Sequence, residues 1–164
     1  MRVSVLIAAA LLLGVPASAQ PQNQVDLKIR GVGLGSAHSS VIKRLGKPAR
    51  QKVGKPYFSE CSESRETSMT LNYPGLQINL AGDGRGRNLK VTSIELTSAN
   101  WSVDQKLSIG ASTETVLARF GTPVRTENEA GMKRLIYFHA EDGGAIFNFR
   151  SGKLVKIGWA LDLC

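Results

Sequence analysis

The chain has 164 residues, a length that favours one domain or two small ones over a large multidomain enzyme. Lys and Arg number 21 against 13 Asp and Glu, and hydrophobic residues make up 42% of the sequence. This composition provides enough apolar material for a core and excludes a disordered or fibrous chain.

The first 19 residues have the pattern of a secretory signal peptide. Arg2 supplies a short positive region, an apolar run covers residues 3–15, and residues 17–19 form a small-x-small cleavage site that ends at Ala19. The run is shorter than the about 20 residues of a permanent membrane span, which disfavours the alternative of a retained anchor. We therefore expect a periplasmic or secreted mature chain without a transmembrane span.

Two cysteines, Cys61 and Cys164, remain in the expected mature chain. In an oxidising compartment an even pair favours a disulfide, which would close a loop of about a hundred residues. The alternatives are an intermolecular bridge or two inert thiols. Neither cysteine belongs to a C-x-x-C pair, so a thiol oxidoreductase is disfavoured.

An internal repeat is the most informative feature of the sequence. Residues 34–50 align without gaps with residues 109–125, 75 positions further along, and six of the 17 aligned pairs are identical. In both copies an apolar helical face is followed by a Gly-x-Pro stretch. Gly46 or Gly121 suits the position after a helix, and the proline prevents the helix from continuing.

Small polar residues before these helices predict their N-caps, namely Ser36 and Ser112. Alternating apolar and polar residues after each helix predict three strands, bounded by turn residues. The predicted strands cover residues 69–73, 76–80 and 90–96, and then 134–138, 145–149 and 153–161.

The predicted fold class is α+β, with two tandem repeats over residues 20–98 and 99–164. Each repeat is expected to be a short helix packed on a three-stranded antiparallel meander. A meander covered by a helix on one side keeps one solvated face. Alternation directs four polar side chains to that face, where a partner could bind: Gln77, Asn79, Asn148 and Arg150.

The repeated pattern resembles a known family. An apolar-Gly-small-polar stretch, then Val-x-x-x-(Leu/Phe)-Gly-x-Pro and a hydrophobic meander, is similar to the beta-lactamase-inhibitor-protein-like (BLIP-like) fold. Outer-membrane assembly lipoproteins of the SmpA/OmlA type share that fold. The resemblance implies helical elements on small antiparallel sheets, whose concave surface binds other proteins. The lipidated cysteine of the lipoprotein branch and the enzyme-blocking residues of the inhibitor have no match here, so neither tethering nor beta-lactamase inhibition follows.

The patterns that could carry catalysis or ligand binding favour structural roles. The glycines of residues 31–35 are spaced G-x-G-x-G, which lacks the dinucleotide-binding spacing. Asp83 alone supplies too few oxygens for calcium, and His38 and His139 have no metal-ligand neighbours. Three acids beside Cys61, which could pair for glycosidic cleavage, read more naturally as a solvated loop: Glu60, Glu63 and Glu66. We therefore expect no catalytic residues, no cofactor and no metal.

A basic segment follows the first predicted helix. Six cations occur within thirteen residues and no acid lies among them: Lys43, Arg44, Lys47, Arg50, Lys52 and Lys55. The corresponding window of the second copy, residues 118–130, is nearly neutral, so the fold itself does not require the charge. The segment is either an ordinary solvated face or a surface for an acidic partner.

These observations favour an exported, non-catalytic protein-binding module. It would act as an inhibitor, an immunity-type factor or an envelope-assembly accessory through its polar sheet face and basic segment. The alternative is an envelope protein that binds anionic lipid or polysaccharide, and a hydrolase ranks third. Nucleic acid is disfavoured by the compartment and by the scarcity of stacking aromatic residues near the basic segment.

Overall fold

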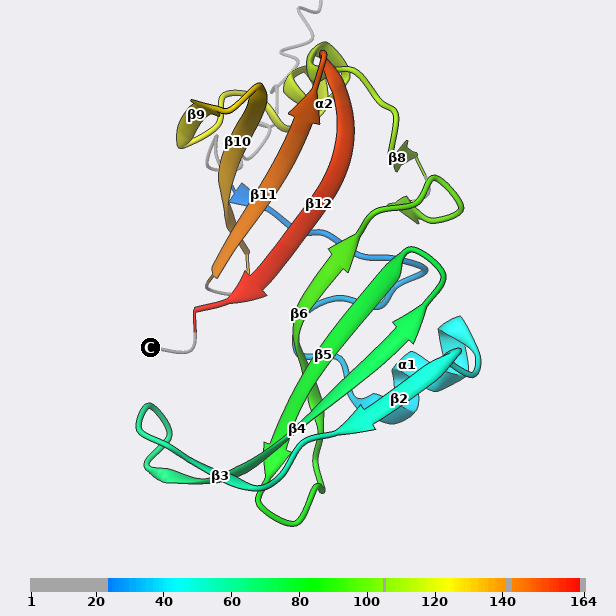
Figure 1. The fold of residues 1–164 in the computed structure, drawn as a ribbon, viewed down its shortest axis with the longest axis vertical. Coiled ribbons are helices and arrows are strands. Elements are labelled where there is room, and N and C mark those ends of the chain that lie inside the picture. The colour runs from blue at the N-terminus through cyan, green and yellow to red at the C-terminus, as the bar shows by residue number, and fades with distance from the viewer. Residues whose placement is uncertain (1–23, 105, 141–142, 163–164) are drawn as a thin grey trace, which may run out of the picture.

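The computed structural model describes residues 24–104, 106–140 and 143–162 (Figure 1). The first half of the chain contributes β1 (Gln24–Val25), α1 (His38–Leu45), β2 (Arg50–Val53), β3 (Tyr57–Ser59), β4 (Ser64–Tyr73), β5 (Leu76–Asp83) and β6 (Lys90–Leu96). The second half contributes β7 (Ser102–Val103), β8 (Leu107–Ser108), α2 (Thr113–Phe120), β9 (Arg125–Glu129), β10 (Met132–His139), β11 (Gly143–Arg150) and β12 (Lys153–Leu161).

Ten of these strands form one sheet. Its order is β1-β10-β11-β12-β6-β5-β4-β2, with β3 also pairing with β4 and β9 with β10. All neighbours are antiparallel except β1 and β10, which are parallel. The two halves of the chain meet where β6 pairs with β12, between residues 93–96 and 157–160.

The predicted fold class is wrong. The chain is not two repeats of a helix on a three-stranded meander, because ten strands form one mixed sheet, β7 and β8 pair with each other separately, and the described residues contain two short helices. The six predicted strands are present within β4, β5, β6, β10, β11 and β12. The polar segments 50–53 and 125–129 add further strands, although their charges interrupt apolar alternation. In two separate meanders, β6 and β12 would be edge strands with unpaired backbone N–H and C=O groups. Here the two strands pair with each other, which satisfies these groups.

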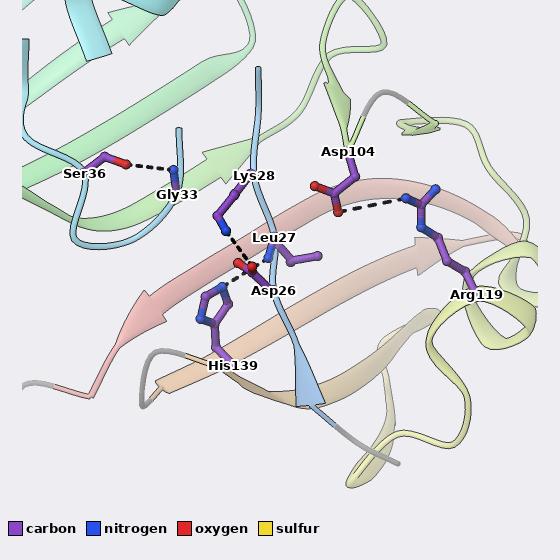
Figure 2. Close-up of polar contacts among 8 residues, drawn as sticks. All are labelled: Asp26, Leu27, Lys28, Gly33, Ser36, Asp104, Arg119 and His139. Atoms are coloured by element: carbon purple, nitrogen blue, oxygen red, sulfur yellow. Dashed lines mark hydrogen bonds and ion pairs between the residues drawn. The ribbon is translucent and has the colours of Figure 1, made fainter. Parts of the chain in front are cut away.

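The two helices begin differently, although both lie where the sequence predicts them. Ser112 caps α2, because its hydroxyl accepts a hydrogen bond from the Thr115 amide at 3.2 Å. The predicted cap at Ser36 is wrong: the N-cap of α1 is Ala37, which makes no side-chain cap bond. The Ser36 hydroxyl instead accepts a hydrogen bond from the Gly33 amide at 3.1 Å (Figure 2).

Both helices end in the same way and contact the same face of the sheet. Gly46 and Gly121 have positive φ, 82° and 74°, a conformation that glycine adopts at little cost. The carbonyl of Gly46 accepts a hydrogen bond from the Tyr73 hydroxyl, and that of Gly121 from the Tyr137 hydroxyl, each at 2.9 Å. The register across the sheet places both tyrosines on the helix-covered face.

The core lies between this face and the elements that cover it. One row of paired residues crosses six strands and is buried throughout: Leu71, Ile78, Ile94, Trp159, Ala145 and Tyr137. Val41 and Leu45 of α1 and Val116 of α2 pack into the same cluster. The apolar alternation predicted from the sequence is therefore present on both sides of the β6–β12 pairing, called here the joint.

An N-terminal strap, residues 24–35, ties the two halves together across the helix-covered face (Figure 1). Its first end pairs with β10, and at its other end the Gly35 amide donates to the Val91 carbonyl of β6 at 2.8 Å. Between these ends the Leu27 amide donates to His139 Nε2 at 3.3 Å (Figure 2). Because Leu27 and Ile29 are fully buried, the strap is part of the core.

Truncating the strap should destabilise the whole sheet. Leu27→Ala removes a side chain that is 0% exposed, so we expect a loss of about 2–5 kcal/mol in the free energy of unfolding. The matched control, Lys28→Ala, removes a half-exposed side chain and its ion pair with Asp26, and should cost less than about 1 kcal/mol. Urea denaturation measures both, and similar costs for the two variants would contradict a core role for the strap.

Tyr137 should make stability depend on alkaline pH. Burial raises its pKa to about 12, above its ordinary value of 10.0, so the folded state favours the neutral phenol. This contribution is complete below about pH 10 and is lost as the pH rises towards about 12.

Tyr137→Phe should therefore be less stable than the natural chain at neutral pH by about 1 kcal/mol, the value of one hydrogen bond. The difference should shrink as the pH passes about 10, because the phenylalanine variant has no phenol to ionise at this position. Denaturant titrations of both chains between neutral pH and about pH 11 measure the difference, and a constant gap would contradict the assignment.

Candidate functional site

The face of the sheet opposite the helices, called here the open face, carries the candidate site. One row of paired residues crosses it from β9 to β2: Arg125, Ile136, Ile146, Gly158, Glu95, Gln77, Asn72 and Arg50. Neighbours in such a row point their side chains to the same side of the sheet. The open face is therefore continuous from one half of the chain to the other.

A hollow of about 1210 Å³ lies on the open face over β9, β10, β11, β12, β6 and β5. Its lining includes small residues of β11 and β12, among them Gly144, Gly158 and Ala160. A Cβ added to Gly158 would meet no atom within 4 Å. Because the glycines have no side chains, the surface is recessed here, as expected for glycine in a strand that another backbone or a ligand approaches closely.

Apolar side chains stand beside these small residues. Phe138 is 60% exposed and Ile146 is 38% exposed, and Ile136 lines the same hollow. Their strands are apolar on both sides, because Tyr137 and Phe147 at the alternate positions are fully buried in the core. The core needs only one of these two faces, so folding leaves the apolar residues on the open face without an assigned role.

The charged residues around the hollow are paired with one another. Arg125 contacts Glu127 at 2.6 Å, and Arg134 contacts the same carboxylate at 3.5 Å. Across the joint between the halves, Lys156 Nζ lies 2.6 Å from Glu95 Oε2. These contacts leave the surroundings of the hollow close to electrically neutral.

The first-half part of the open face is a polar network centred on Asn79. Its Oδ1 accepts a hydrogen bond from the Thr70 hydroxyl at 3.0 Å, and its Nδ2 donates to Ser93 Oγ at 2.9 Å. Gln77 Nε2 lies 3.4 Å from the same Oδ1. Asn79 is thus held in one orientation beside the hollow.

The structure brings together some of the binding residues predicted from the sequence. Gln77, Asn79 and Asn148 project from the open face, and Asn79 and Asn148 line the hollow. Arg150, at the end of β11, is exposed on the same side by alternation but does not line the hollow.

The six cations of the basic segment do not gather at the hollow. Lys43 and Arg44 belong to α1, Lys47 follows the helix, Arg50 and Lys52 lie on β2, and Lys55 precedes β3. Arg44 Nη1 donates to the Arg30 carbonyl at 3.3 Å, which ties it to the strap.

The hollow residues that sequence reasoning missed are Phe138, Ile146 and Gly158. Two signals for them exist in the sequence. Residues 135–138 are continuously apolar rather than alternating, and Gly158 interrupts an apolar strand. Neither signal identifies a site until the pairing of β6 with β12 is known.

Two acids considered for calcium binding or for catalysis, Asp83 and Glu66, make structural contacts. Asp83 accepts hydrogen bonds from the amides of Arg87 at 2.9 Å and Arg85 at 3.0 Å, and these bonds hold its pKa below the usual value. Glu66 accepts from the Tyr57 hydroxyl at 3.0 Å. Among the described residues, no group of three or more His, Cys, Asp or Glu is arranged to hold a metal ion.

The predicted disulfide lies partly outside the described residues. Cys61, between β3 and β4, is disulfide-bonded. Cys164 is beyond the described part of the chain, so its pairing with Cys61 stays a prediction. The signal peptide over residues 1–19 also lies outside the described residues.

Comparison with known proteins yields a similarity of fold. No protein-family model matches the chain, and no curated protein matches its sequence. The structure is similar to that of an extracellular protein containing a SCP domain from Bacillus anthracis str. Ames, with a TM-score of 0.51 and 13% sequence identity. The match covers 88% of this chain and 50% of the Bacillus anthracis chain, so this chain spans about half the length of that protein. At this identity the likeness concerns the fold and does not test the BLIP-like resemblance.

Membrane insertion by a helix is not indicated by the part of the chain that the structure describes. Neither α1 nor α2 is long and apolar enough to cross a bilayer.

The open position at Gly158 can be tested by stability alone. Gly158→Ala places a methyl group in free space on a strand, so we expect unchanged stability or a gain of up to about 1 kcal/mol. The matched control is Gly143→Ala, whose Cβ would collide with the Ala160 carbonyl oxygen and should destabilise the sheet. Thermal unfolding measures both variants. Equal losses of stability would show that the face over Gly158 is filled.

Proposed function

We propose that this chain is an exported, non-catalytic protein-binding module that holds a partner protein on its open face. The observation that carries the proposal is the hollow itself, with Phe138 and Ile146 exposed beside the glycine and alanine residues of β11 and β12. Exposed apolar groups ringed by polar residues are typical of protein interaction sites.

The size of the hollow supports a protein partner over a small ligand. Pockets for small molecules usually enclose about 300–1,000 Å³ and bury most of their ligand. This hollow is about 1210 Å³ and is lined by residues of six strands of an exposed sheet face. A projecting loop or side-chain cluster of another protein fits it better, with an aromatic residue such as Phe138 as an anchor.

The charges around the hollow support the same choice. An anionic lipid or polysaccharide surface, the alternative from the sequence, is attracted by cations that lack partners. Here Arg125, Arg134 and Lys156 already contact carboxylates of the same face. Such pairs contribute hydrogen-bonding specificity to a protein interface with little net attraction for a polyanion.

Export rests on the signal-peptide pattern of residues 1–19 and on the expected disulfide between Cys61 and Cys164. The structural neighbour is described as extracellular, which is compatible with this proposal. A concave sheet face that binds proteins is also what the BLIP-like resemblance implies, and the proposed role is that of an inhibitor, an immunity-type factor or an envelope-assembly accessory.

Filling the hollow should abolish capture of the partner. The immobilised mature chain is incubated with an envelope extract, and captured proteins are quantified by mass spectrometry beside those of Gly158→Val and Ile146→Glu. Because an added Cβ at Gly158 meets no atom within 4 Å, we expect Gly158→Val to fold while its side chain occupies the space that the partner needs. A specific partner is lost with both variants, by about tenfold or more if about 1.4 kcal/mol of binding is removed.

The matched control alters an exposed site away from the hollow. Arg85 lies in the turn after β5 and does not line the hollow, so Arg85→Glu should capture the partner as the natural chain does. A protein retained equally by all variants would contradict binding at the open face.

A further inference from the structure

The outer edge of β2 is a second surface with its own chemistry. β2 ends the strand order of the sheet, and no described strand pairs with its outer side (Figure 1). Its four residues, Arg50–Val53, are all exposed. None of them lines the hollow on the open face.

The backbone of β2 is oriented to pair on this side. The Gly54 amide donates to the Ser68 carbonyl of β4 at 2.8 Å, so Gly54 directs its hydrogen-bonding groups inward. In antiparallel pairing, successive residues alternate between the two sides of the strand. Val53 and Gln51 therefore direct their amide and carbonyl groups to the free edge.

The side chains of β2 differ between the two faces. Arg50 is paired with Asn72 and Lys52 with Thr70, which places both cations on the side of the open face. Gln51 and Val53 point to the other side, where Val53 is 55% exposed. One side of the free edge is thus basic, and the other offers an exposed apolar group.

The cations of this edge have no carboxylate partner. The sequence contains no Asp or Glu from residue 41 to residue 59. Among the described residues, neither Arg50 nor Lys52 forms an ion pair, and neither does Lys47 or Lys55 at the two ends of the strand. This distinguishes the edge from the hollow, where the cations are paired.

We propose that the free edge of β2 binds an extended acidic segment of a partner protein by strand addition. Asp or Glu at alternate positions of that segment would lie opposite Arg50 and Lys52, about 5 Å away between Cβ atoms. Apolar residues at the intervening positions would lie on the side of Val53. The main-chain groups of Gln51 and Val53 supply the hydrogen bonds, as in other cases of strand addition.

The charges of the edge disfavour two other occupants. A second copy of β2 in antiparallel pairing would place cations opposite cations, which is destabilising and protects edges from self-association. An anionic membrane would require the cations on one flat side. Here Arg50 and Lys52 point to the open face, whereas Lys43 and Arg44 belong to α1 on the opposite face.

The test uses the full mature chain and the labelled peptide Thr-Glu-Val-Glu-Val-Glu-Thr, with binding followed by fluorescence anisotropy. Arg50→Glu/Lys52→Glu should weaken binding by about tenfold or more, because two attractive cross-strand pairs become repulsive. The control Lys106→Glu/Lys153→Glu changes the net charge equally at residues of the second half and should change affinity by less than about threefold.

Two further measurements separate strand addition from general attraction of anions. N-methylation of the peptide at one set of alternate residues should abolish binding, while methylation at the other set should be tolerated. In the natural chain the peptide should slow hydrogen exchange at the Gln51 and Val53 amides. Equal tolerance of both methylated peptides, or unchanged exchange at these amides, would overturn the proposal.

A third comparison uses vesicles of pure phosphatidylglycerol against pure phosphatidylcholine. Binding to the anionic vesicles that Arg50→Glu/Lys52→Glu abolishes, together with failure of the peptide to bind, would assign the edge to lipid and overturn the proposal. Because the hollow is not involved, capture that depends on Gly158 can succeed or fail independently of these results.

Discussion

The pairing of β6 with β12 is the interaction on which the rest of the structure depends. Four residues of each strand pair there, and they convert two sets of strands into one sheet. On the covered face this joint brings Ile94 beside Trp159 in the core, and on the open face it brings Glu95 beside Gly158. The hollow spans the joint, so neither half of the chain could form it alone. The strap reinforces the same joint by contacting β10 at one end and β6 at the other.

The sheet carries two surfaces that differ in how their charges are satisfied. Around the hollow, carboxylates such as Glu127 and Glu95 neutralise the nearby cations. The features that distinguish this surface are therefore its exposed apolar side chains and its shape. Along β2, neither Arg50 nor Lys52 has a carboxylate partner among the described residues, and the attraction of these cations for anions extends into solvent over about a Debye length. Exposed ion pairs contribute little to the free energy of unfolding. The ion pairs around the hollow therefore orient its polar side chains more than they stabilise the fold.

Local features of the fold could be predicted from the sequence, whereas its assembly could not. Helices ending at Gly46 and Gly121 followed from the Gly-x-Pro pattern, and the central strands followed from alternation. The strands at residues 50–53 and 125–129 escaped prediction because charged residues at exposed edges carry no apolar period. The joint was missed because local patterns describe each strand but not its neighbour. The strap was missed because its short apolar run pairs with residues more than a hundred positions away.

The same limits explain how much of the candidate site was foreseen. Asn79 and Asn148 were placed on the solvated face because alternation determines which side a strand residue faces. Phe138 and Ile146 were not, because an apolar residue in a strand is ordinarily assigned to the core, and here the core occupies the other side. The row from Arg125 to Arg50 crosses eight strands, which at a spacing of about 4.8 Å corresponds to about 34 Å along the sheet. A protein interface of standard size, burying about 800 Å² on each partner, has a similar width. The two proposed binding surfaces therefore lie within the width of one ordinary interface, with the cations of β2 at one end and exposed apolar side chains at the other.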